Sequence, residues 1–104
     1  MKEYSVLMTH TATEDLKNIA SYLANQRCEP SVAKKLVANI KEAVMSLQQM
    51  PTRHSLLSDA NLATQGIRKI LVDNYIVFYV VTEKDHVVTI VGILHSRREW
   101  VNLL

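Results

Sequence analysis

The sequence predicts an α+β domain in which a helical hairpin packs on a twisted antiparallel sheet. Two observations carry this prediction. Apolar residues recur at helical spacing in two long segments of the first half, whereas the second half contains three short apolar runs separated by two or three polar residues. We therefore expect the order strand, helix, helix and three strands, as one domain over residues 1–104.

The composition is that of a folded chain without bulk affinity for nucleic acid. Of its 104 residues, 48% are hydrophobic and 21% are charged, which supports one core but not two. The formal net charge is only +2, so any basic interaction must come from a local cluster. The lone Cys28 excludes an intramolecular disulfide and fits a reducing cytoplasm. We expect neither a signal peptide nor a membrane span.

The first half predicts a strand followed by an amphipathic helix. Residues 3–9 alternate loosely between polar and apolar side chains, as in a strand. Thr11 and Glu14 form a capping-box pattern, which predicts that the helix begins there. The apolar stripe of this helix consists of Ala12, Leu16, Ile19, Ala20 and Leu23.

A second helix is predicted over about residues 30–50. Pro30 suits its first turn, where the missing N–H costs nothing, and Pro51 closes it. Two long helices joined by about four residues form an antiparallel hairpin. The apolar stripe of the second helix consists of Ala33, Leu36, Val37, Ile40, Val44 and Leu47.

The remaining elements are strands. Residues 51–66 lack periodicity and predict a loop, after which residues 67–72, 75–82 and 86–95 predict three strands joined by hairpin-length linkers. The run from 75 to 82 is apolar on both faces, which is typical of a central strand covered by helices.

Cationic side chains in the first and last of these strands suggest a binding site. Arg68 and Lys69 belong to the first strand, and His95, Arg97 and Arg98 follow the last. We expect the end of the last strand to return toward the beginning of the first, so that His95 and Arg97 approach Arg68. Such a concavity suits phosphate, since guanidinium groups bind it bidentately and imidazole exchanges protons near pH 7. The alternative is a solvated turn after the last strand.

Other candidates are weaker. Arg53, in the loop after the second helix, either adds to a basic site or is only solvated. Trp100 and Leu103 belong to an apolar tail that folds back on the body or contacts a partner. Tyr75 and Tyr79 are core residues or stack on a base. The four histidines have no carboxylate at ligand spacing, so we expect no metal and no cofactor.

The element order and four motifs together resemble the RelE/ParE superfamily, the toxins of type II toxin–antitoxin modules. The motifs are A-x-x-D-L-x-x-I-x-x-Y at 12–22, IRK at 67–69, NYIVFYVV at 74–81 and ILHSRREW at 93–100. The resemblance implies the predicted fold and a cognate antitoxin that wraps the toxin in a hetero-oligomer. Trp100 and Leu103 are candidates for that contact.

The superfamily divides into two mechanisms. The resemblance to RelE-like members implies ribosome-dependent mRNA cleavage, with Arg68, His95 and Arg97 as catalytic residues. Those members commonly carry an arginine in the middle strand, where this chain has Ile76, and isoleucine cannot stabilise charge on a phosphate.

The resemblance to ParE-like members implies inhibition of DNA gyrase without chemistry of the toxin's own. The apolar NYIVFYVV and the ending ILHSR are closer to that pattern. We therefore expect a gyrase inhibitor of the plasmid-stabilising type, with Arg53, Lys69 and Arg98 as target or nucleic-acid contacts. The alternatives are an mRNA interferase and a non-toxic binding module.

Overall fold

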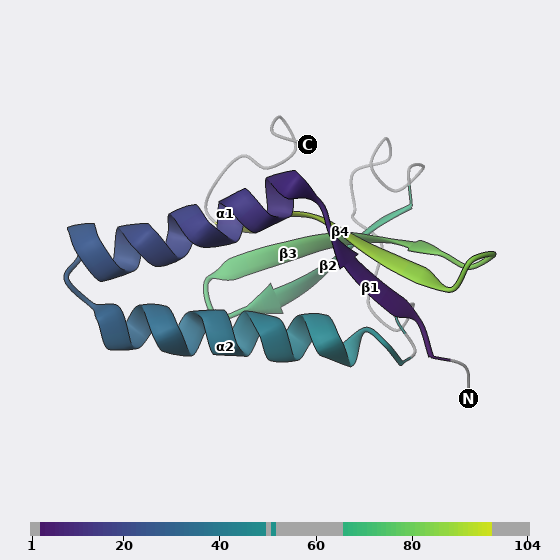
Figure 1. Cartoon of the computed structure of the whole chain (residues 1–104), viewed down its shortest axis with the longest axis horizontal. Coiled ribbons are helices and arrows are strands. Elements are labelled where there is room, and N and C mark those ends of the chain that lie inside the picture. The colour runs from purple at the N-terminus through teal and green to yellow at the C-terminus, as the bar shows by residue number, and fades with distance from the viewer. Residues whose placement is uncertain (1–2, 50, 52–65, 97–104) are drawn as a thin grey trace.

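The computed structural model describes residues 3–49, 51 and 66–96, and their order of elements confirms the prediction (Figure 1). Figure 1 shows α1 and α2 side by side across one face of the sheet. The elements are β1 (Ser5–Met8), α1 (His10–Ser21), the π-helix η1 (Tyr22–Gln26), α2 (Pro30–Ser46), β2 (Ile67–Val72), β3 (Tyr75–Thr82) and β4 (Val87–His95).

The four strands form one mixed sheet in the order β1-β4-β3-β2. The segment β2-β3-β4 is the predicted antiparallel meander. The first strand, however, joins β4 in parallel, with Ser5 opposite Val87 and Met8 opposite Ile90. Parallel neighbours need a long crossover, and the helical hairpin together with the meander supplies it.

Helix α1 begins two residues before the predicted capping box. The N-cap is Thr9, whose Oγ1 accepts a hydrogen bond from the Ala12 N–H at 3.1 Å. The backbone N–H of Thr9 donates to the Ile90 carbonyl at 3.0 Å, so pairing with β4 holds Thr9 in extended geometry at the strand end. The helix therefore starts as soon as the strand stops, and the prediction of Thr11 as the cap is wrong.

The connection between the helices contains a widened turn that the sequence pattern did not predict. The Arg27 N–H donates to the Tyr22 carbonyl at 3.1 Å, five residues back, which defines η1. Cys28 then adopts a left-handed φ of 54°, and Pro30 occupies the first turn of α2 as predicted. Helix α2 ends at Ser46 rather than near residue 50 because the next N–H groups bond three residues back.

The main core lies between the helices and one face of the sheet. Both helical stripes contribute to it, and Ala12, Ile40 and Leu47 are fully buried. Residues 76–79 of β3 are all buried, which confirms the prediction of a central strand. The second cluster, Ile67, Ile76 and Phe78, lies on the opposite face of the sheet.

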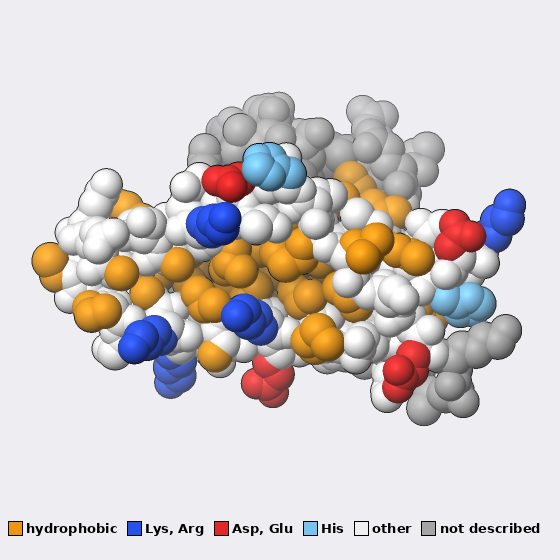
Figure 2. Space-filling model, viewed as in Figure 1, with side chains coloured by type: hydrophobic (Ala, Val, Ile, Leu, Met, Phe, Trp, Pro, Cys, Tyr) orange, Lys and Arg blue, Asp and Glu red, His pale blue; other side chains and the backbone are white. Residues whose placement is uncertain are grey.

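The seam between the helices is also apolar on its outer side. In Figure 2, hydrophobic side chains gather along the middle of the face, and Lys and Arg side chains lie among them and beside them. A shallow groove there is lined by Ala20, Ala24, Pro30, Ala33, Lys34 and Val37.

One buried hydrogen bond ties the end of the helical hairpin to the sheet. The Tyr79 hydroxyl donates to the Pro51 carbonyl at 2.7 Å. Replacing Tyr79 with phenylalanine leaves that carbonyl without its donor, and we expect a loss of about 1–2 kcal/mol in the free energy of unfolding. Urea denaturation measures the change. Tyr4→Phe removes an exposed hydroxyl, bonded to Glu83 at 2.6 Å, and should shift the midpoint far less. Equal shifts would contradict the prediction.

Candidate functional site

Arg68 and His95 lie at opposite ends of the meander, so the predicted cationic concavity is wrong. Arg68 pairs with Tyr79, whereas His95 pairs with Tyr75, four residues away along β3. At strand spacing, this places the two Cα atoms about 13 Å apart along the sheet, with β3 between them. The physical reason is direction: the first and third strands of a meander run the same way, so the end of β4 meets the end of β2.

Arg68 and Lys69 point to different faces. Arg68 shares the helical face with its partner Tyr79, and the exposed Lys69 shares the other face with Phe78. Arg53, Arg97, Arg98, Trp100 and Leu103 lie outside the described residues.

A β-bulge turns His95 toward the helices. Phe78 pairs with Gly92 and Tyr79 pairs with Ile90, so β4 has one extra residue at this point. The bulge reverses the alternation, and Ile93 and His95 therefore face the helices along with Ile90. The His95 ring meets the Tyr75 ring edge-on, with centroids 5.1 Å apart and an interplanar angle of 79°.

Around this pair lies a cleft at the end of the fold where the helical hairpin turns. It has two adjoining hollows of about 500 and 410 Å³, which share Tyr22, Tyr75 and His95. The larger hollow reaches the start of α2 and the β2–β3 turn. Its charged and polar lining consists of Arg27, Glu29, Lys35, Asp73 and Asn74.

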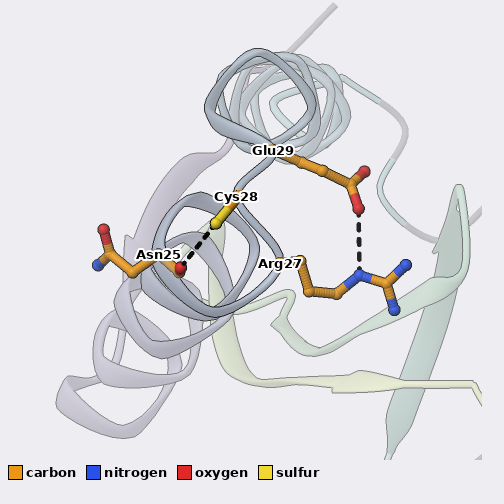
Figure 3. A network of polar contacts seen from close by, with 4 residues as sticks. All are labelled: Asn25, Arg27, Cys28 and Glu29. Atoms are coloured by element: carbon orange, nitrogen blue, oxygen red, sulfur yellow. Dashed lines mark hydrogen bonds and ion pairs between the residues drawn. The ribbon is translucent and has the colours of Figure 1, made fainter.

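Arg27 and Glu29 form the closest ion pair of the cleft. Figure 3 shows the Arg27 side chain leaving the turn between the helices, with its Nε donating to Glu29 Oε1 at 3.1 Å. This hydrogen bond, and then a side-chain hydrogen bond with Tyr22, raise the pKa of Arg27 above its usual value. The guanidinium therefore stays charged at the cleft wall.

Tyr75 is the half-buried member of the cleft. Burial raises the pKa of Tyr75 above the usual value for tyrosine, and Tyr22 raises it further, while Arg27 acts in the opposite direction. Tyr75 therefore stays a neutral phenol at physiological pH, able to donate a hydrogen bond. Together with Arg27, it gives the cleft donors for an anion beside aromatic rings.

The sequence analysis identified His95 but missed Tyr22 and Arg27. Tyr22 is 73 positions and Arg27 is 68 positions before His95 in the chain, and no local pattern joins them. The only available signal was the tyrosine that ends the motif at 12–22. In the structure Tyr22 is 47% exposed, and it is not part of the apolar stripe of that helix.

Asp15, from the same motif, positions the end of β4. Beyond Ile90 the parallel partner β1 has ended, so among the described strands β4 has no neighbour on this side. The Asp15 carboxylate on α1 accepts a hydrogen bond from the Ile93 N–H at 3.1 Å. It thereby fixes the segment that carries His95 into the cleft.

Ile76 occupies the position where the RelE-like resemblance expects an arginine. Its side chain is only 6% exposed and lies in the second apolar cluster with Ile67 and Phe78. Leu94 and Leu71 are its cross-strand neighbours, and both are apolar. The side chain at this position itself offers a phosphate no cation, and Lys69, opposite Phe78, is a described cation on the same face of the sheet.

Neither a metal site nor a membrane span is found in the part of the chain that the structure describes. No three histidine, cysteine, aspartate or glutamate residues gather there as ligands. None of its helices combines the length and the hydrophobicity that a bilayer crossing requires.

Comparison with known proteins agrees with this architecture. Residues 6–100 match the family model described as the ParE toxin of the type II toxin–antitoxin system parDE. Among curated protein sequences, none matches the chain significantly.

Several solved structures share the fold. The chromosomal ParDE system of P. aeruginosa aligns with a TM-score of 0.69 at 23% identity, over 89% of this chain and 96% of that one. The Mycobacterium tuberculosis RelBE2 toxin–antitoxin complex aligns with a TM-score of 0.65 at 22% identity, over 91% of this chain and 93% of that one. A mutant of the E. coli toxin RelE in the free state aligns with a TM-score of 0.69 at 13% identity, over 97% of this chain and 92% of that one.

A helical hairpin on this four-stranded mixed sheet defines a toxin of the RelE/ParE superfamily. Because the family model spans nearly the whole chain, the protein belongs to the ParE toxin family of type II toxin–antitoxin systems.

Proposed function

We propose that this toxin acts by inhibiting DNA gyrase through contact rather than by catalysis. The observation that carries the proposal is the burial of Ile76 among apolar neighbours, where RNA-cleaving relatives are expected to carry an arginine. Phosphodiester cleavage needs charge stabilisation at the reacting phosphate, and an aliphatic cluster supplies none.

The separation of Arg68 from His95 supports the same proposal. Catalytic groups must reach one reacting centre at hydrogen-bond distance, about 3 Å from each. Arg68 and His95 belong to opposite ends of the meander, so they do not form one constellation. We assign Lys69, with Arg53 and Arg98, to contact with gyrase rather than to chemistry.

We further propose that a cognate antitoxin neutralises the toxin in a hetero-oligomer in the cytoplasm. The family is that of type II modules, and two structural neighbours are described as toxin–antitoxin systems or complexes. Trp100 and Leu103 remain our candidates for the antitoxin contact, and maintenance of a plasmid is the role we expect of such a module.

One observation favours a second function, that of a ribosome-dependent mRNA interferase. Free RelE aligns with the chain as well as the ParDE system does, at a TM-score of 0.69 in both cases. His95 beside Tyr75 also provides an imidazole and a phenol at one cleft. In that function His95, with Arg68 and Arg97, would be tested as catalytic.

The test compares the two targets directly. Purified toxin is incubated with DNA gyrase, ATP and relaxed plasmid, and supercoiling and trapped double-strand breaks are scored. We expect inhibition with cleavage complexes, abolished when the antitoxin encoded beside the toxin is added first. Intact supercoiling at excess toxin would refute the proposal.

The second arm uses a translation extract with a reporter mRNA. mRNA that is cut only while translated, and is left intact by a His95→Ala variant, would establish the interferase instead. Inactivity in both arms would identify a non-toxic binding module.

A further inference from the structure

The cleft around Tyr22 and Tyr75 combines a held cation with flat aromatic surfaces. Arg27 Nε donates a hydrogen bond to Glu29, Tyr22 is a second side-chain hydrogen-bond partner of Arg27, and Figure 3 shows the two terminal amino groups of Arg27 beyond the bond to Glu29. A carboxylate that holds an arginine in this way lowers the entropy lost when the guanidinium binds a second oxyanion. Lys35 lines the same hollow and adds a second cation.

Neutral donors accompany these cations. Tyr22 and Tyr75 both line the two hollows, and their hydroxyls add O–H groups to the N–H groups of Arg27. Charged and neutral donors from three elements suit the three terminal oxygens of a phosphate monoester.

The aromatic rings suit a nucleobase. The Tyr22 ring is 47% exposed, and Tyr75 and His95 form an edge-on pair at the junction of the hollows. Stacking on tyrosine contributes to nucleotide binding whichever base is present. A cleft of about 500 Å³ accommodates one nucleotide, within the usual range for small-molecule sites.

The balance of charge limits the ligand to a small number of phosphates. Glu29 and Asp73 line the hollow as well as Arg27 and Lys35, so its ionised groups cancel. Glu29 is bonded to Arg27, and Asp73 Oδ2 accepts a hydrogen bond from the Asn39 amide at 3.2 Å. A duplex or a polyphosphate needs an excess of cations, which this cleft does not provide.

Backbone with a positive φ borders the cleft on two sides. Cys28, between Arg27 and Glu29, has a φ of 54°, and Asp73 has a φ of 53°. Asp73 is the first residue of the two-residue β2–β3 hairpin turn, where aspartate commonly adopts a positive φ, and Cys28 follows the π-turn η1. Both turns present lining residues to the same hollow.

We propose that this cleft binds one nucleotide, with its phosphate at Arg27 and Lys35 and its base against Tyr22 and Tyr75. The site lies on the helical face, whereas Ile76, the position tied to RNA cleavage, lies on the opposite face of the sheet. Lys69, the described residue that we assign to gyrase contact, lies on that opposite face as well.

The test is isothermal titration calorimetry on the full chain with AMP, adenosine and inorganic phosphate. We expect AMP to bind at least about tenfold more tightly than either fragment, because only AMP fills both halves of the cleft. Arg27→Gln should weaken AMP about tenfold and bring it close to adenosine. Tyr22→Ala should weaken AMP by a similar factor through loss of stacking.

Lys41→Gln is the matched control, because Lys41 is an exposed cation of α2 outside the cleft lining. It should leave AMP affinity unchanged. No binding of AMP at about 5 mM, or equal affinity of the wild type and Arg27→Gln, would overturn the site. Circular dichroism melting shows that each variant is folded.

A 5′-phosphorylated tetranucleotide distinguishes the two sources of the ligand. Binding about tenfold tighter than AMP means that the site takes the end of a single strand, and equal binding means that it takes the free nucleotide. Both results support the site. Calorimetry uses no gyrase, so it tests the nucleotide site alone. The supercoiling assay tests the proposed function, and either proposal can fail without the other.

Discussion

Ile76→Arg is expected to destabilise the protein by about 3–5 kcal/mol, without conferring RNA cleavage, because it places a charge without a partner inside an apolar cluster. Ile76 is 6% exposed and packs with Ile67 and Phe78. The guanidinium must either be desolvated there or force the cluster apart. Urea denaturation gives the free energy of unfolding, and a translation extract with a reporter mRNA gives the activity.

Leu71→Arg is the matched control for this substitution. Leu71 is the cross-strand partner of Ile76 on the same face of the sheet, but it is 66% exposed. The same change of residue type should therefore cost within about 0.5 kcal/mol. If Ile76→Arg folds as stably as Leu71→Arg, the cluster is not the barrier that we describe. If it also cuts mRNA, the gyrase proposal loses its main support.

The second large effect is expected for Asp15→Ala, which should cost about 2–3 kcal/mol. The substitution leaves the Ile93 N–H of β4, beyond the end of β1, without its charged acceptor. Hydrogen exchange should show faster exchange at Ile93 and along the end of β4, while β2 keeps its protection. The Tyr75–His95 ring contact depends on that segment, so AMP affinity should fall as well.

Glu14→Ala is the control for the Asp15 variant. Glu14 is the preceding residue of α1 and makes only an exposed contact of 3.9 Å with Lys17. Its loss should change stability by less than about 0.5 kcal/mol. Equal effects of the two variants would mean that helix propensity, and not the contact with Ile93, determines the result.

The sequence predicted the helices and strands well because the spacing of apolar residues shows which face of each element is buried. The apolar run of β3 needs cover on both faces, and residues 76–79 have it. Helix and strand boundaries depend on specific hydrogen bonds instead. Thr9, and not Thr11, is the N-cap because the hydrogen bond with Ile90 fixes the backbone of Thr9. That contact is distant in the sequence, so no local pattern predicts it.

The candidate site was only partly predictable. His95 was found from its place at the end of an apolar strand. The bulge at Val91 decides which face His95 points to, and the sequence pattern does not reveal that bulge. Arg68 was joined to His95 by a wrong reading of strand direction. Tyr22 and Arg27 come from the helical hairpin, and only the packing of that hairpin on the sheet brings them to the cleft.

The parallel pairing of β1 with β4 also sets the timing of folding during synthesis. Ser5 pairs with Val87, 82 residues later, and β4 is the neighbour of β1 among the strands that the structure describes. At typical translation rates of about 5–20 residues per second, the first strand waits about 4–16 s for its partner. The nascent chain cannot complete this sheet before β4 has been synthesised.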